Sequence, residues 1–301
     1  MKPIQSEIEE LKKTAENGDA EAQTQLGKKY YHADGVKKNY NIAAHWFIKA
    51  ARQGHPLAKF YLGNLLLFEN SFLEEDPEKA LELFRDAEEQ GIEDASGFIG
   101  YMYCLGWIVD KNREEGMRRL LKAADNGKDW AMYLIGDVYF QDFFDNDGVA
   151  EEAAEDAAKE AVKWFTKAAE SGSPQAMRKL GEMYDLAFGV RGNPDEAERW
   201  YRKAGEQGDS IALFELSEAL YNGFDGLCPN RIDHLESYRL LRESAYLGYK
   251  VAKEVLWDCY GERVPEENEE NEDYEDDFWN VLTKYSDNEN LYNYMQENDD
   301  I

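Results

Sequence analysis

The chain has 301 residues, of which 43% are hydrophobic and 32% charged, enough apolar material for one or two folded domains. Its net charge of −29 argues against nucleic acid or an anionic membrane surface as a partner, because both repel a negative protein, whereas a basic partner would be attracted. Three cysteines without a Cys-x-x-Cys pair argue against a disulfide framework or a zinc site of that kind.

The first eighteen residues lack the apolar stretch of a secretory signal, and no run of eighteen apolar residues occurs anywhere. We therefore expect a cytoplasmic protein in a reducing compartment. Only 7 prolines occur, alternating Val, Ile and Thr runs are almost absent, and Ala, Glu, Leu and Lys are abundant. This composition predicts an all-α fold.

A lone helix is predicted near residues 5–17, just before the first of seven glycines that divide the chain at nearly regular intervals. These register glycines follow one another after 36, 37, 36, 45, 36 and 40 residues: Gly18, Gly54, Gly91, Gly127, Gly172, Gly208 and Gly248. Alanine stands four residues after every one of them. A repeat of this length is typical of a helical solenoid.

Each repeat begins with a helix whose apolar residues stand 4, 8 and 12 positions after the register glycine, on one helical face. Five repeats have another glycine nine positions after it, for example Gly181, which predicts the close approach of another backbone. A second helix, rich in alanine and aromatic residues, completes the repeat. Asn193-Pro194 and Asp76-Pro77 predict the start of that helix, and the register glycine suits the left-handed residue that ends it.

The sequence therefore predicts a right-handed α/α superhelical solenoid over residues 1–260. It contains six helix-turn-helix repeats, near 19–54, 55–91, 92–127, 128–172, 173–208 and 209–248, with half-repeats near 5–17 and 249–260. Neighbouring repeats must stack, because one pair of helices cannot bury its apolar face alone. Residues 261–301 form an acidic tail with 15 acidic and 2 basic residues.

The repeats share a pattern: Ala-x-x-x-Leu-Gly-x-x-Tyr, then Gly-Val, then Ala-x-x-Trp-Tyr/Phe-x-Lys-Ala-Ala-x-x-Gly. This pattern resembles that of Sel1-like repeats, which are relatives of the tetratricopeptide repeat. The resemblance covers residues 5–260 and is strong in the first, fourth and fifth repeats. In the sixth, Ser244-Ala245 replaces Ala-Ala, and in the second, Phe68-Glu69-Asn70 replaces the usual glycine turn.

The resemblance implies an adaptor that holds other proteins together. Some bacterial members of the family are immunity proteins paired with toxins, so neutralisation of a basic toxin is the alternative. A third possibility is a hydrolase of the penicillin-interacting kind. It is disfavoured because the cysteine pair that those extracellular relatives carry in each repeat is missing here.

A partner is expected on the face of the first helices that points away from the predicted core, at positions 3, 6, 10 and 13 after the register glycine, on the concave side of the solenoid. An ordinary solvated face would not carry so many aromatic residues. The predicted partner-binding residues are Phe60, Leu67, Tyr101, Trp130, Tyr133, Asp137, Phe140, Glu182, Asp185, Phe214, Glu218 and Tyr221. The alternative is that these aromatic residues are additional core.

No catalytic residue, cofactor or metal is predicted, because the sequence contains no phosphate-binding loop, no His-Glu-x-x-His and no Gly-x-Ser-x-Gly. The nine residues added to the fourth repeat, within 141–160, form either a functional insertion or a helix extension. Asp145, Asp147 and Gly148 lack two ligands of a calcium loop. Aromatic residues at helical spacing in the tail, such as Phe278 and Trp279, either cap the solenoid or join in binding.

Overall fold

The computed structural model describes residues 3–67, 76–144, 151–224 and 231–264, and within these ranges it contains helices and no strands. The chain divides into two compact units, Met1–Gly261 and Glu262–Ile301. The predicted tail helices and the Asp145–Gly148 segment lie outside the described residues. No described helix combines the length and apolar character that a bilayer crossing requires.

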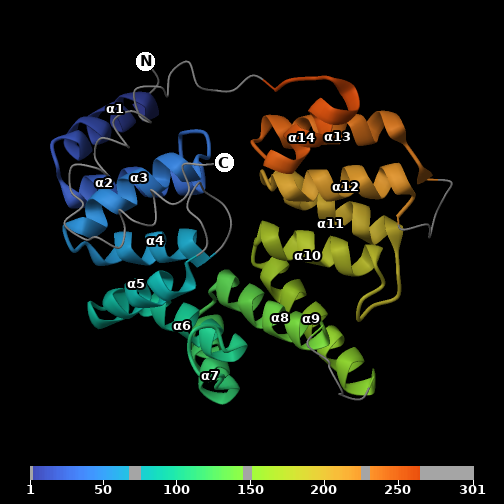
Figure 1. Ribbon diagram of the computed structural model, residues 1–301, viewed down its shortest axis with the longest axis horizontal. Coiled ribbons are helices and arrows are strands. Elements are labelled where there is room, and N and C mark those ends of the chain that lie inside the picture. Colours follow the sequence, from blue (N-terminus) through green and yellow to red (C-terminus); the bar gives the residue numbers. More distant parts are fainter. Residues whose placement is uncertain (1–2, 68–75, 145–150, 225–230, 265–301) are drawn as a thin grey trace. The chain divides into compact units, whose positions relative to one another are not determined.

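Two kinds of helix alternate along the first unit (Figure 1). The first helices of the repeats are α2 (Ala20–His32), α4 (Pro56–Leu67), α6 (Glu93–Leu105), α8 (Asp129–Phe144), α10 (Pro174–Asp185), α12 (Ser210–Asn222) and α14 (Lys250–Tyr260). The second helices are α1 (Pro3–Glu16), α3 (Tyr40–Arg52), α5 (Pro77–Glu89), α7 (Arg113–Asp125), α9 (Glu151–Glu170), α11 (Pro194–Glu206) and α13 (His234–Tyr246). This is the predicted all-α superhelical repeat fold.

Each first helix from α2 to α12 packs against the second helix of its own repeat and against the second helix of the preceding repeat, and α14 packs against α13. Some first helices also contact each other: α6 contacts α8, and α10 contacts α12. The core runs through the stack as three adjoining clusters of buried Ala, Leu, Phe and Tyr side chains. The sequence pattern produces this core because alanines and aromatics alternate on the facing helices.

Small residues let the two helices of a repeat approach closely. A Cβ added at Gly181 would lie 2.6 Å from the Tyr201 ring, and one added at Gly27 would lie 2.6 Å from the Phe47 ring. The third repeat differs, because a Cβ added at Gly100 would meet the Gly116 carbonyl oxygen at 2.8 Å. The predicted approach of another backbone is therefore confirmed at Gly100, whereas at Gly27 and Gly181 the space is filled by an aromatic ring of the second helix.

Turn residues set the repeat length. All seven register glycines have a positive φ, between 77° and 104°, so the predicted left-handed conformation is confirmed. Asn or Asp caps five of the second helices by accepting from a backbone N–H of the first turn; these residues are Asn39, Asp76, Asn112, Asn193 and Asp233. The backbone N–H of each cap also donates to a carbonyl near the end of the preceding first helix, as Asn193 does to Tyr184 at 3.0 Å.

The fourth repeat is longer because both of its helices are longer. Helix α8 has 16 residues and α9 has 20, whereas the helices of the other repeats have 12 or 13. Most of the added residues therefore extend helices, which was one of the two alternatives that the sequence left open.

Candidate partner-binding surface

The first-helix face, defined as positions 3, 6, 10 and 13 after each register glycine, is more buried than the sequence predicted. Seven of its predicted residues are at most 9% exposed: Phe60, Leu67, Tyr101, Asp137, Phe140, Asp185 and Phe214. Trp130, Tyr133 and Glu182 are half-buried, and Glu218 and Tyr221 are exposed. The exposed members thus lie in the sixth repeat, and a partner-binding role for the whole set stays a prediction.

Trp130 and Tyr133 pack against the core instead of pointing away from it. The Trp130 ring stacks on Phe98 with a centroid distance of 4.7 Å and an interplanar angle of 21°, and it covers Gly97 of the preceding first helix. The Tyr133 ring lies 5.7 Å from that of Phe165. The expectation that these rings face away from the helix–helix core is wrong, because Trp130 packs on the preceding first helix and Tyr133 packs on the second helix of its own repeat.

A buried hydrogen bond joins the first helices of the third and fourth repeats. The Tyr101 hydroxyl of α6 donates to Asp137 Oδ2 of α8 at 2.5 Å. Burial raises the pKa of the Asp137 carboxyl, although the bond from Tyr101 lowers it again. Burial and the adjacent carboxylate also raise the pKa of Tyr101. The pair therefore fixes the register of α6 against α8.

Carboxylates occupy the tenth position after the register glycine in three successive repeats. We call Asp137, Glu182 and Glu218 the carboxylate row. Lys179 forms an ion pair with Glu182 at 2.7 Å, and its ammonium lies 4.7 Å from the centre of the Phe140 ring. Burial raises the pKa of Glu218, which is nonetheless exposed. The row becomes more exposed from the fourth repeat to the sixth.

A nearly buried guanidinium lies beside the row. Arg178 Nη1 pairs with Glu215 Oε1 at 3.1 Å, and Arg178 Nε lies 3.5 Å from Asp209 Oδ2. Burial alone would lower the pKa of Arg178, but Glu215 and Asp209 raise it. Burial raises the pKa of Glu215 to about 7, although Arg178 lowers it. Glu215 Oε2 is buried and has no hydrogen-bond donor among the described residues.

This arrangement of helices and turns matches the family model described as Sel1 repeat six times, over residues 20–55, 56–92, 94–128, 131–173, 174–209 and 210–249. The chain belongs to the Sel1 repeat family. This match confirms the resemblance that the sequence showed. Sel1 repeats typically form scaffolds for protein–protein interaction.

The curated relatives are longer than this Sel1 repeat chain. An uncharacterised protein of Neisseria meningitidis serogroup B is 27% identical over 249 residues, which are 83% of this chain and 48% of that protein. An F-box protein of Arabidopsis thaliana is 34% identical over 110 residues, which are 36% of this chain and 29% of that protein. The chain thus spans less than half the length of these relatives.

Two solved structures are similar to the chain. A Sel1 repeat protein from Oxalobacter formigenes is 27% identical, with a TM-score of 0.47, and the match covers 75% of this chain and 85% of that one. An immunity protein from Pseudomonas aeruginosa is 21% identical, with a TM-score of 0.48, and the match covers 76% and 81%.

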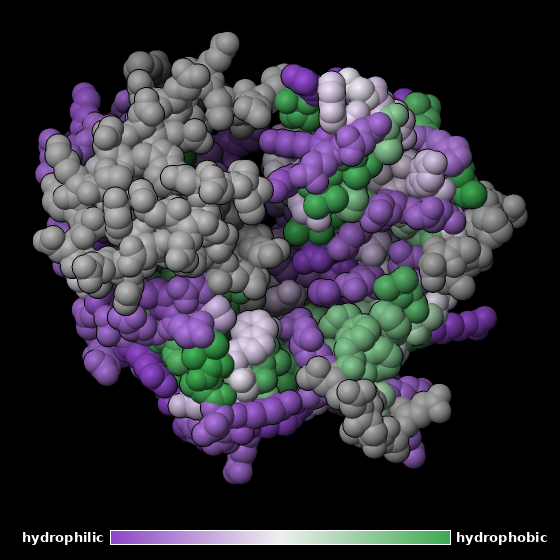
Figure 2. All heavy atoms as spheres, in the orientation of Figure 1, coloured by the Kyte–Doolittle hydropathy of each residue, from purple (hydrophilic) through white to green (hydrophobic). Residues whose placement is uncertain are grey.

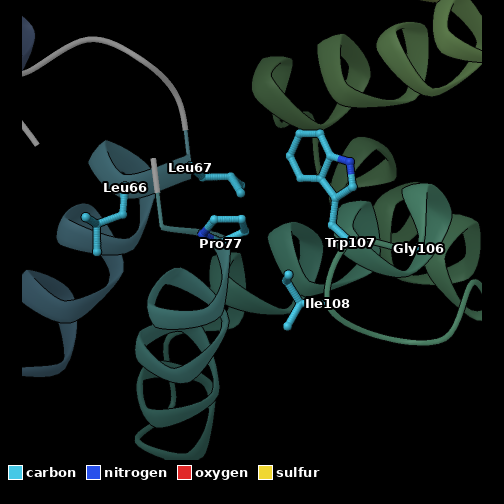
Figure 3. Close-up of a pocket in the computed structure, with 6 residues that line it drawn as sticks. All are labelled: Leu66, Leu67, Pro77, Gly106, Trp107 and Ile108. Atoms are coloured by element: carbon cyan, nitrogen blue, oxygen red, sulfur yellow. The ribbon is translucent and has the colours of Figure 1, made fainter. Parts of the chain in front are cut away.

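A cavity of about 310 Å³, lined mainly by residues with apolar side chains, opens beside Sel1 repeats two and three. Figure 3 shows Leu67 and Pro77 on one side and Trp107 and Ile108, from the loop after α6, on the other. Trp107 is 38% exposed and its ring lies 5.6 Å from that of Tyr101. Sequence reasoning missed this cavity, since its residues come from two repeats and meet only through the way these repeats stack.

Sequence reasoning also missed Lys179, Asp209 and Glu215 as neighbours of the row. The spacing of Lys179 and Glu182, three residues apart on one helix, could have indicated their ion pair. The pairing of Arg178 with Glu215 spans 37 residues, so it depends on how α10 packs against α12.

Proposed function

We propose that this Sel1 repeat protein is a non-enzymatic adaptor that binds a segment of a partner protein on the first-helix face of its fifth and sixth repeats. The partner presents basic side chains there. The carboxylate row carries this proposal, because Glu182 and Glu218 stand at equivalent positions of adjacent repeats and one of them is exposed. Charge complementarity of this kind speeds association and selects the partner.

A neighbouring aromatic residue supports this position. Tyr221 is 53% exposed at the end of α12 and its ring centre lies 4.8 Å from that of His234, which gives an aromatic contact next to the acidic groups.

Neutralisation of a basic toxin is a second candidate, and the net charge of −29 favours it for the same reason. An adaptor and an immunity protein would use the same face. The identity of the bound protein separates them, because a toxin loses its activity when bound whereas a client of an adaptor keeps it.

The test compares the full chain with Glu182→Gln/Glu218→Gln. The matched control is Glu78→Gln/Glu114→Gln, which removes the same charge from exposed positions of α5 and α7. Each protein is used to capture partners from the source lysate, and the affinity of the captured partner is then measured by calorimetry. We expect binding about tenfold weaker in the first variant and unchanged in the control. Equal affinities for all three proteins would exclude this face.

Alanine substitution of Trp130 and Tyr133 is unsuitable as such a test. Because both rings pack against the hydrophobic core, we expect Trp130→Ala/Tyr133→Ala to lower the free energy of unfolding by about 3 kcal/mol or more. Thermal melting of the purified variant checks this. A melting temperature equal to that of the wild type would show that neither ring belongs to the core and would support their assignment to the partner-binding surface.

A further inference from the structure

The extended fourth repeat exposes a cluster of phenylalanine rings. Phe143 and Phe144 lie in the last turn of α8, and Phe188 lies in the loop after α10. The Phe188 ring centre is 5.2 Å from that of Phe143 and 5.7 Å from that of Phe144. We call these three residues the phenylalanine patch. Phe144 is 55% exposed whereas Phe143 and Phe188 are half-buried, so the patch faces solvent through the Phe144 ring.

The extra length of α8 explains why the patch is exposed. Phe140, one turn earlier, is 6% exposed and belongs to the core, and its ring contacts Phe144 with a centroid distance of 5.0 Å. The added turn of α8 places Phe144 outside the core, although Phe140 lies within it. A solvated helix end favours polar residues, so adjacent Phe143 and Phe144 at this end indicate a surface that another molecule covers.

The loop that carries Phe188 is held against α9. A Cβ added at Gly189 would lie 2.5 Å from the carbonyl carbon and oxygen of Ala158, so the loop touches the α9 backbone directly. Gly189 has a φ of 64°, which an alanine would adopt only with strain. The extended helix α9 therefore fixes Phe188 beside α8, and the patch is formed before any partner arrives.

Acidic residues border the patch. Residues 151–160, at the start of α9, contain five acidic residues and one basic residue. Glu155 and Asp156 are exposed on α9 within one turn of Ala158, where they share one cation, Lys159, at 2.9 Å and 3.7 Å, so the pair keeps a net negative charge. Asp142, beside Phe143, pairs with Arg113 at 2.6 Å. Figure 2 shows apolar surface near α8 and the loop after α10, among hydrophilic side chains. The surface thus combines an apolar centre with a negative border.

We propose that the phenylalanine patch and the acidic start of α9 bind an amphipathic helix of a partner protein, with apolar side chains on one face and Lys or Arg beside them. The rings receive the apolar face, and Glu155 and Asp156 pair with the basic flanks. This surface uses none of the residues of the carboxylate row, so it gives the scaffold a second set of binding residues.

The test uses a fluorescent synthetic peptide of about 18 residues whose leucines lie on one face of a helix and whose lysines lie on the rest of it. One control peptide has the same composition with the leucines scattered, and another has Glu in place of Lys. We expect the full chain to bind the first peptide about tenfold more tightly than either control. Equal binding of the scattered peptide would overturn the proposal.

Variants of the full chain locate the peptide. We expect Phe144→Ser to weaken binding about tenfold, while Ile232→Ser, another exposed apolar residue, changes it by less than about twofold. Glu155→Lys/Asp156→Lys should weaken binding strongly at low salt and less at high salt. Unchanged affinity in Phe144→Ser would overturn the proposal.

Two further measurements cover the remaining outcomes. If Phe144→Ser lowers the melting temperature, a photoreactive peptide on the wild-type chain must cross-link to residues 143–144 or 188, and cross-links elsewhere contradict the site. If Phe144→Ser instead abolishes a dimer of the free chain, a second copy covers the patch and the proposal is wrong. Glu182→Gln/Glu218→Gln must retain the peptide, since its loss there would assign the peptide to the carboxylate row.

Discussion

At the residue scale, the glycine nine positions after the register glycine sets the distance between the two helices of a repeat. A Cβ at Gly181 would overlap the Tyr201 ring at 2.6 Å, and Tyr201 is 2% exposed, so the ring has no free space to move into. In an open helix the same change from glycine to alanine stabilises the chain. Whether Gly181→Ala lowers or raises the free energy of unfolding therefore shows whether the two helices are in close contact.

We expect Gly181→Ala to lower the free energy of unfolding by about 1–3 kcal/mol, because the ring or the helix must shift. Urea unfolding measures it, with Glu206→Ala at an exposed position of α11 as the control, where a change below about 0.5 kcal/mol is expected. A gain of about 1 kcal/mol for Gly181→Ala would show that the helices are not in close contact.

The buried Glu215 should make stability depend on pH. Its pKa is raised from 4.5 to about 7 in the folded protein, chiefly by burial. The folded state therefore binds this proton more tightly than the unfolded state, and the resulting stabilisation is complete below pH 4.5 and disappears as the pH rises through about 7.

We expect the free energy of unfolding of the wild type to fall more steeply than that of Glu215→Gln between about pH 5 and about pH 7, by roughly 1 kcal/mol per pH unit. Urea unfolding of both proteins across this range tests it, since the other acidic groups titrate alike in both. Parallel curves would mean that Arg178 holds Glu215 ionised throughout.

At the scale of the element, the capping residue both starts a second helix and ties it to the preceding first helix. Asn193 accepts from the backbone N–H groups of Asp195 and Glu196 and donates its own N–H to Tyr184. Four other second helices begin in the same way. The cap thus fixes the turn within the repeat.

We expect Asn193→Ala to lower the free energy of unfolding by about 1 kcal/mol and Asn193→Asp to leave it nearly unchanged, because aspartate keeps the accepting oxygen. Thermal and urea unfolding of the two variants measure this difference. Equal losses in both variants would show that the amide of Asn193, rather than its cap oxygen, matters.

At the scale of the whole molecule, charge dominates. The chain carries 63 acidic and 34 basic residues, and many acidic groups remain on its surface. Their mutual repulsion destabilises the folded chain and weakens as salt screens it.

We therefore expect the melting temperature to rise by a few degrees between about 10 mM and about 300 mM sodium chloride. Potassium chloride should give the same rise, because screening does not depend on the cation. A falling melting temperature would mean that ion pairs between repeats, such as Arg178 with Glu215, outweigh the repulsion.

The sequence by itself determined the repeat period, the two helices of each repeat, their caps and their family, because helix periodicity and capping depend on residues within a few positions of one another. It also determined which glycines admit close contact. Only the tertiary structure decided that Tyr101 and Trp130 lie between first helices and that Arg178 meets Glu215, because these contacts join residues of different repeats. The same packing decided that Phe144 faces solvent while Phe140 is buried, since neighbouring repeats cover one turn of α8 and not the next.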